Sequence, residues 1–277
     1  MMRWLIALTM LAAPLATSTE ARQAGEKTSI SFDSALELEI VVRDGKGEST
    51  RLLNLNRREK FVQTRVDGRT VKVDCLSSVL QKSGTDTPVE EKSTGLAGHS
   101  YVATKTENGW TVKNSEGGAP PTEGLNLGAW NDVAQLLPQG GVEPKQGEKW
   151  NVEAKDLLNL IFPAAMREGT GKIECACESI DGGKANIVFN GQLTGKGKEE
   201  TGSTVTMTVK TGRLVYDFSN KKPAQLMLQG SYEATSDMVD VVRKPGTGGT
   251  VNNEEERRKV GEISVKTNKL DASISFE

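Results

Sequence analysis

Apolar and polar side chains alternate along residues 202–235, and this period of two predicts β-strands. The apolar positions are Val205, Met207, Val209, Leu214, Tyr216, Phe218, Leu226, Leu228, Tyr232 and Ala234. The phase changes at Thr211 and Gly212, which indicates a turn or a glycine-assisted bulge. Residues 219–223 predict a further turn, because they contain Asn220 and end in Pro223. We therefore expect a three-strand antiparallel meander around which the rest of the chain is organised.

The other apolar segments mostly show the same alternation. Strands are predicted at 36–43, 50–66 and 71–75, and a hairpin is predicted around Glu107-Asn108-Gly109. Residues 83–94 are polar and predict a loop. The final segment, 263–276, predicts a strand or hairpin with a phase change near Asn268.

The period changes in the middle of the chain. Apolar residues recur at spacings of three and four in 127–137, which predicts an amphipathic helix. A second short apolar helix is expected at 155–166, where Pro163 limits its length. The predicted fold class is therefore mainly β (α+β), with a large antiparallel sheet of meander strands and two short helices in the middle of the chain.

The N-terminus has the pattern of a secretory signal peptide. Arg3 is followed by the apolar segment 4–13, which is too short to span a bilayer, and by a small-x-small cleavage site ending at Ala21. We expect residues 1–21 to be removed, which predicts a periplasmic or extracellular protein. Residues 22–277 are expected to form one β-rich domain, with a possible subdivision into 28–113 and 125–277 around the linker 114–124. No other segment is apolar enough to cross a membrane.

Composition narrows the choice of partners. The formal charge of −2 provides no basic field for nucleic acid. The 29 glycines predict many turns, and an aromatic content of 5% predicts a largely aliphatic core. A soluble β-rich protein follows from this composition.

The sequence offers little catalytic chemistry. His99 is the only histidine, so a nucleophile–histidine–acid triad would have to use it, and the chain has no Gly-x-Ser-x-Gly motif. We interpret His99 as a turn or surface residue. Residues 191–197 resemble a phosphate loop but lack its spacing and the following Ser or Thr. No catalytic residue, metal site or cofactor is predicted.

Three cysteines, Cys75, Cys175 and Cys177, are the most reactive groups in the chain. Cys175 and Cys177 lie about 6.6 Å apart on one strand face, where a mutual disulfide would be strained. Cys75 is able to pair with Cys175 or Cys177 if the N- and C-terminal sheets meet there, and the predicted compartment permits a disulfide. Buried free thiols are the alternative, and metal binding is disfavoured because four ligands are lacking.

One segment carries a resemblance to known proteins. Leu137-Pro138 and residues 142–150 (VEPKQGEKW), followed by the meander with residues 212–217 (GRLVYD), resemble uncharacterised secreted bacterial β-rich proteins. These are similar in organisation to half-barrel carriers of lipoproteins and lipids. The resemblance covers mainly residues 125–277 and implies a curved antiparallel sheet or half-barrel with a concave apolar face.

We therefore expect an exported, non-catalytic envelope protein that binds a hydrophobic small molecule or an envelope protein on its curved sheet. The candidate ligand-binding residues are Leu214, Tyr216, Leu226 and Leu228. Two alternatives stay open. The first is a structural or adaptor protein with a filled core, and the second is an exported hydrolase that uses two converging carboxylates. An apolar hollow left unfilled by the helices distinguishes the first hypothesis from these alternatives.

Overall fold

The computed structural model describes residues 24–106, 109–121, 127–138, 141–153, 168–196, 203–244 and 254–277. Twelve strands form one antiparallel sheet. The strands are β1 (Lys27–Asp44), β2 (Gly47–Arg65), β3 (Thr70–Gly84), β4 (Thr87–Ser93), β5 (Ser100–Thr106), β6 (Gly109–Asn114), β7 (Lys149–Glu153), β8 (Glu168–Asp181), β9 (Lys184–Lys196), β10 (Thr204–Asp217), β11 (Lys222–Lys244) and β12 (Glu254–Phe276).

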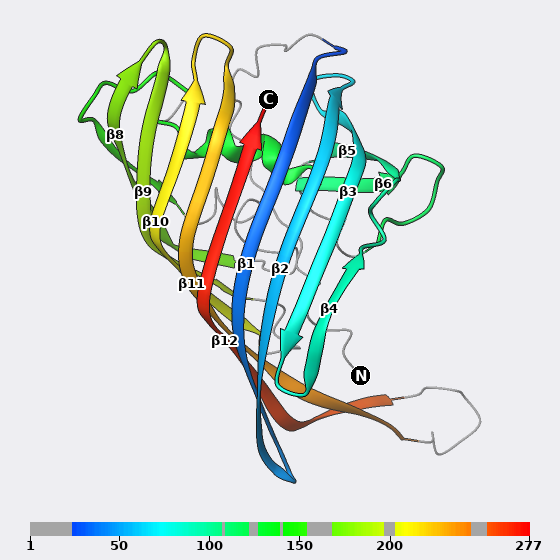
Figure 1. The fold of residues 1–277 in the computed structure, drawn as a ribbon. Coiled ribbons are helices and arrows are strands. Elements are labelled where there is room, and N and C mark those ends of the chain that lie inside the picture. Colours follow the sequence, from blue (N-terminus) through cyan, green and yellow to red (C-terminus); the bar gives the residue numbers. More distant parts are fainter. Residues whose placement is uncertain are drawn as a thin grey trace.

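The sheet is open and joins the two ends of the chain at its centre. The strand order is β6-β5-β3-β2-β1-β12-β11-β10-β9-β8-β7, and β4 pairs with β3 beside this path. The first and last strands therefore lie side by side, as Figure 1 shows in blue and red. The meander at 202–235 lies to one side of the centre, so the sheet is organised around β1 and β12 instead.

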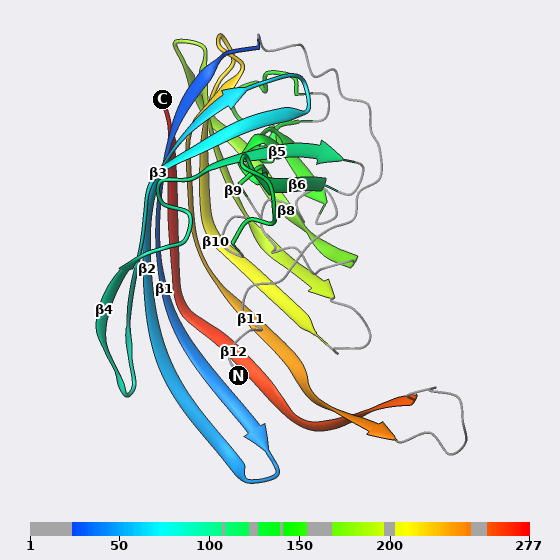
Figure 2. The same ribbon diagram turned by 90° about the vertical axis from the view of Figure 1, so that its right-hand side faces the viewer.

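The sheet is strongly curved. Figure 2 shows β5, β6 and β8 on the same side of the central strands, which gives the sheet an inner and an outer face. Bulges contribute to this shape, because an extra residue bends and twists its strand. The registers shift at Leu76 in β3 and at Asn268 in β12.

Glycine permits close approach of the backbone at one of these bends. Gly230 in β11 precedes a register shift against β12. A Cβ atom at Gly230 would lie 2.2 Å from the carbonyl oxygen of Thr208 on β10. Any larger residue would therefore push β10 and β11 apart at this bend.

One short helix, η2 (Ala129–Leu136), is present in the described part of the chain. It confirms the helix expected at 127–137, as a 3-10 helix of eight residues. Its three-residue period places Val133 and Leu136 on one side, where both are buried, and leaves Ala134 exposed. The second expected helix, at 155–166, and the predicted signal peptide both lie outside the described residues.

The strand predictions need two further corrections. The phase change at Thr211 is a bulge within the single strand β10, so residues 204–235 form two strands and not three. Residues 83–94 are not a loop, because they contain the end of β3 and all of β4. The phase change near Asn268 is confirmed as a bulge in one continuous strand.

Candidate functional site

The four candidate residues on β10 and β11 share the inner face of the sheet. Leu214 lies opposite Leu226, and Leu228 lies opposite Gly212, in antiparallel pairs that point to the same side. Leu214, Tyr216 and Leu226 are buried in the main core. Leu228 is half-buried and packs against the edge of that core. Of the four, Leu228 alone is accessible to a ligand.

The same face continues as a partly exposed apolar surface on the central strands. Leu36 of β1 lies opposite both Leu270 of β12 and Leu55 of β2, so the three form one row across the sheet. We call the half-buried large apolar residues of this face the apolar strip, which consists of Phe32, Leu36, Ile40, Leu53, Leu55, Leu228, Ile263 and Leu270.

The apolar strip is the part of the site that sequence reasoning missed. The signal was present, because Leu36, Ile40 and Leu270 occupy alternating positions of their strands. Only the strand order shows that these strands are neighbours, since the link between β1 and β12 joins segments more than 200 residues apart in the sequence. Alternation in the sequence therefore predicts that these residues share one face of the sheet. It does not predict which strands lie beside them.

Helix η2 covers the inner face at one end of the sheet, and a buried carboxylate holds it there. The side chain of Asp132 accepts hydrogen bonds from Lys105 Nζ on β5, at 2.5 Å, and from Trp110 Nε1 on β6, at 3.0 Å. Gly128 lies against the Trp110 ring, where a Cβ atom would approach within 2.4 Å. The helix is thereby fixed to the β5–β6 edge.

The other end of η2 is fixed toward the opposite edge of the sheet. Trp150 Nε1 on β7 donates a hydrogen bond of 3.0 Å to the carbonyl oxygen of Leu136. Near its start, η2 is also held by β2, where Gln63 Nε2 donates to Asn131 Oδ1 at 2.6 Å. The helix therefore bridges elements from both edges of the open sheet, as it does behind the strands in Figure 1.

A second buried polar cluster lies on the inner face of β2 and β3. Arg57 Nη2 and Glu59 Oε1 are 2.7 Å apart, and Ser78 donates a hydrogen bond of 2.5 Å to Glu59 Oε1. Thr94 donates to the Ser78 hydroxyl at 2.6 Å. The cluster ties the segment after β4 to the sheet where β3 changes its partner from β4 to β5.

The three cysteines are buried free thiols, so Cys75 is joined to neither Cys175 nor Cys177. Cys75 lies on β3 and the other two lie on β8, with six strands between β3 and β8 in the sheet order. Burial raises the pKa of Cys75 to about 11, helped by the nearby Glu59 carboxylate, and that of Cys175 to about 12. Burial also raises the pKa of Cys177. These thiols are held in the unreactive protonated form.

The other candidate groups are dispersed. His99 is exposed in the turn before β5, where its backbone N–H donates to the carbonyl oxygen of Leu96. The buried carboxylates Glu59 and Asp132 are each engaged by their own cation. Within the described ranges, no three His, Cys, Asp or Glu residues gather as a metal site. No helix in the same ranges is long and apolar enough to cross a membrane.

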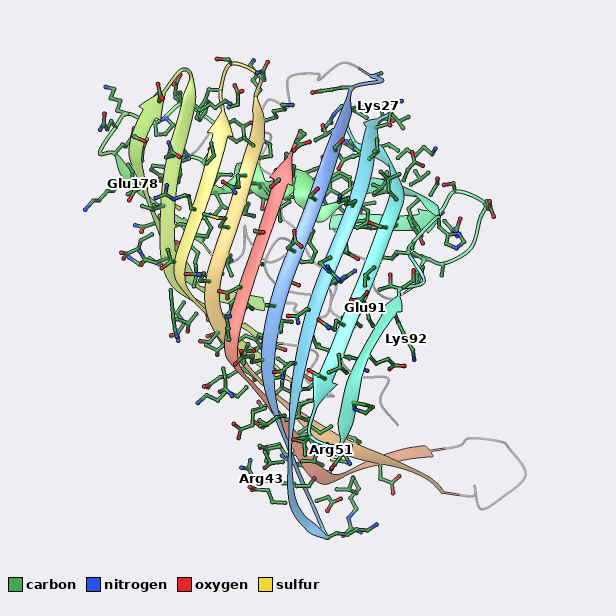
Figure 3. The ribbon with its side chains drawn as sticks, in the orientation of Figure 1. Lys27, Arg43, Arg51, Glu91, Lys92 and Glu178 are labelled. Carbon is green, nitrogen blue, oxygen red and sulfur yellow. The ribbon has the colours of Figure 1, made fainter. Side chains whose placement is uncertain are left out.

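The outer face of the sheet is polar. Figure 3 shows charged side chains across this face and at its ends, including Lys27, Arg43, Glu91 and Glu178. Cross-strand ion pairs such as Arg58–Glu91, at 2.9 Å, lie in solvent. Exposed pairs of this kind contribute little to stability, so the outer face is adapted to water and the inner face is the candidate binding surface.

Comparison with known proteins gives no family. No protein-family model matches the chain, and no curated protein matches it. Among solved structures, it is similar to a protein described as an outer membrane lipoprotein-sorting protein domain from Vibrio parahaemolyticus, with 11% identity, a TM-score of 0.14, and coverage of 86% of this chain and 84% of that chain. It is also similar to an outer membrane channel from Pseudomonas putida F1, with 7% identity, a TM-score of 0.22, and coverage of 96% and 100%.

Neither similarity carries a functional conclusion, because both identities are below 25%. Both TM-scores are low. The residues of this chain are therefore the only guide to its function.

Proposed function

We propose that the protein is an exported, non-catalytic carrier that binds an acyl chain against the inner face of its curved sheet. The observation that carries the proposal is the partial exposure of the apolar strip. Large aliphatic side chains such as Leu36 and Leu270 are half-buried on the inner face, although the outer face is polar. Contiguous apolar surface of this kind is typical of a binding site.

The proposed site has a wall and an open part. Leu214, Tyr216 and Leu226 belong to the same buried core as the residues of η2, so they form the wall at the covered end. Leu228 borders this wall, and the apolar strip continues from it along the central strands. An acyl chain lying along the strip would exchange water for aliphatic contact at about 0.8 kcal/mol per buried methylene.

The test is ligand-dependent stability of the delipidated protein. Saturation with a methyl ester of a long-chain fatty acid is expected to raise the unfolding free energy by about 2.7 kcal/mol at one hundred times Kd. The shift should appear in thermal unfolding. Native mass spectrometry of protein purified without delipidation should also show a bound lipid.

A pair of neighbouring variants distinguishes the two faces. Leu36→Asp places a charge on the inner face and should abolish the ligand-dependent shift. Ala35→Asp places the same charge on the outer face and should retain it. The absence of both a bound lipid and a shift in the wild-type protein would contradict the carrier and favour an adaptor with no ligand.

The same proposal places the protein in the bacterial envelope. We infer export from the signal-peptide pattern at 1–21 and cleavage after Ala21, with residues 22–277 as a single domain. N-terminal sequencing of the protein recovered from the periplasm should begin at Arg22. Retention of the precursor in the cytoplasm would overturn the localisation and leave the binding proposal intact.

A further inference from the structure

An ion pair faces the inner side of the sheet at the covered end of the apolar strip. Glu59 lies opposite Phe32, and Arg57 lies opposite Ser34, so both point to the inner face. Only 2% of the Glu59 side chain is exposed, whereas 28% of the Arg57 side chain is exposed. Arginine is therefore the member of the pair that a ligand is able to reach.

The position of Arg57 suits contact with one end of a ligand on the strip. Along β2, Glu59 and the buried Phe61 lie on one side of it, and Leu55 and Leu53 of the strip lie on the other. The row that contains Arg57 continues across the sheet through Ser34 and Ala272 to Leu228. Ser34 and Ala272 are small, so the middle of this row carries no bulky side chain.

The charges of the pair restrict the chemistry of that ligand end. Glu59 is fixed by Arg57 and by the hydroxyl of Ser78, so its negative charge stays beside the guanidinium. A guanidinium carries five N–H donors and is able to donate to Glu59 and to a further acceptor at the same time. Because Glu59 offsets the charge of Arg57, a free carboxylate in that place would gain little net attraction for the hydration that it loses. An uncharged carbonyl oxygen loses much less hydration on burial.

We propose that Arg57 donates a hydrogen bond to the ester or amide carbonyl of the bound acyl chain, and that Glu59 disfavours free fatty acids. This inference rests on the proposed carrier function and narrows its ligand to ester-linked or amide-linked acyl chains. The apolar strip holds the chain, and the ion pair selects the group to which the chain is attached.

The test compares three ligands of similar chain length by displacement of the uncharged dye Nile red. The ligands are methyl dodecanoate, sodium dodecanoate and tridecane. Wild-type protein should bind the methyl ester about tenfold more tightly than either the alkane or the carboxylate, as expected for one hydrogen bond to a charged donor. Arg57→Met should bring the affinity for the ester down to that for the alkane.

Two further variants complete the design. Glu59→Gln should raise the affinity for dodecanoate about tenfold relative to the ester, because the neighbouring negative charge is removed while an acceptor for Ser78 remains. Arg58→Met is the matched control, since Arg58 lies on the outer face and pairs with the exposed Glu91. The control should leave all three affinities unchanged.

The outcomes separate this inference from the carrier function. Failure of the wild-type protein to displace Nile red with any ligand contradicts the carrier and the inference together. Equal affinity for all three ligands, unchanged in Arg57→Met and Glu59→Gln, contradicts the inference alone. If Arg57→Met does not fold, the inference is tested with Arg57→Lys and Glu59→Gln instead. Lysine retains a donor, so Arg57→Lys should keep part of the preference for the ester over the alkane.

Discussion

Asp132 is the residue on which the attachment of η2 depends. Its carboxylate is buried, and it accepts hydrogen bonds from Lys105 and Trp110 on two strands. Replacement by alanine leaves the Trp110 N–H buried without this acceptor and removes the partner of the Lys105 charge. We expect Asp132→Ala to lower the unfolding free energy by about 2–3 kcal/mol, measured by urea denaturation.

A surface ion pair provides the control for this prediction. Arg58→Ala removes the exposed pair with Glu91 and should cost less than about 1 kcal/mol. Asp132→Asn, which keeps an acceptor for Trp110, should fall between the two. Equal effects of Asp132→Ala and Arg58→Ala would show that η2 is not held by this carboxylate.

The buried thiols predict how stability depends on pH above 9. In the unfolded chain these thiols ionise near their ordinary pKa of 9.0, whereas in the folded protein the pKa is about 11 for Cys75 and about 12 for Cys175. Between these values the unfolded state binds fewer protons, so stability is complete below pH 9 and falls as the pH rises. Each thiol should contribute a slope of about 1.4 kcal/mol per pH unit.

Urea denaturation between pH 8 and pH 10.5 measures this slope. A variant with Cys75→Ala and Cys175→Ala should be less stable at pH 8, because of the lost packing, but should show a shallower decline above pH 9. Cys177 and Tyr232 keep a smaller decline in both proteins, since burial raises the pKa of each of these groups. Identical slopes in the two proteins would contradict the burial of the thiols.

At the scale of the elements, the β11–β12 hairpin ends in a ribbon without sheet neighbours. β1 pairs with β12 only as far as Gly261, and β10 pairs with β11 only as far as Thr235. The paired residues beyond these points belong to β11 and β12 alone, and Figures 1 and 2 show them bending away from the sheet. Among its residues with described side chains, the ribbon contributes none to the main core.

Shortening the ribbon should therefore leave the fold intact. Replacing residues 240–258 by Asn-Gly joins Val239 to Lys259, which are already opposite each other, through a two-residue hairpin turn. We expect the unfolding free energy to stay within about 1 kcal/mol of the wild-type value in urea. A loss as large as that of the core variant Leu214→Ala, about 3 kcal/mol, would show that the ribbon supports the sheet.

The ribbon also shows why some elements escaped prediction. Residues 244–259 are rich in glycine and charge, which predicts a long exposed loop, but residues 254–259 of this segment belong to β12. In the structure, opposite charges meet across the two strands, as in the ion pair Asp237–Lys259 and the paired positions Asp240 and Arg258. Such pairing stabilises a ribbon, but it becomes visible only when the register is known. Alternation within one strand, as in β10, was readable without that knowledge.

At the scale of the whole molecule, the sequence predicts the fold class better than the binding surface. The mainly β fold and the open antiparallel sheet follow from two-residue periodicity. The candidate residues Leu214, Tyr216 and Leu226 are inner-face residues, as alternation predicts, but they are packed in the core. The exposed strip instead depends on β1 pairing with β12, a contact that no local pattern encodes.

The central claim is that an acyl chain lies against the inner face of β1 and its neighbours. Photo-crosslinking of the wild-type protein with a methyl ester that carries a diazirine on its acyl chain, followed by peptide mass spectrometry, tests it most directly. The account predicts labels on Leu36 and Ile40, the half-buried inner-face residues of β1, with none on Ala35, Glu37 or Glu39. Labelling of the outer-face residues, or of neither set, would contradict it.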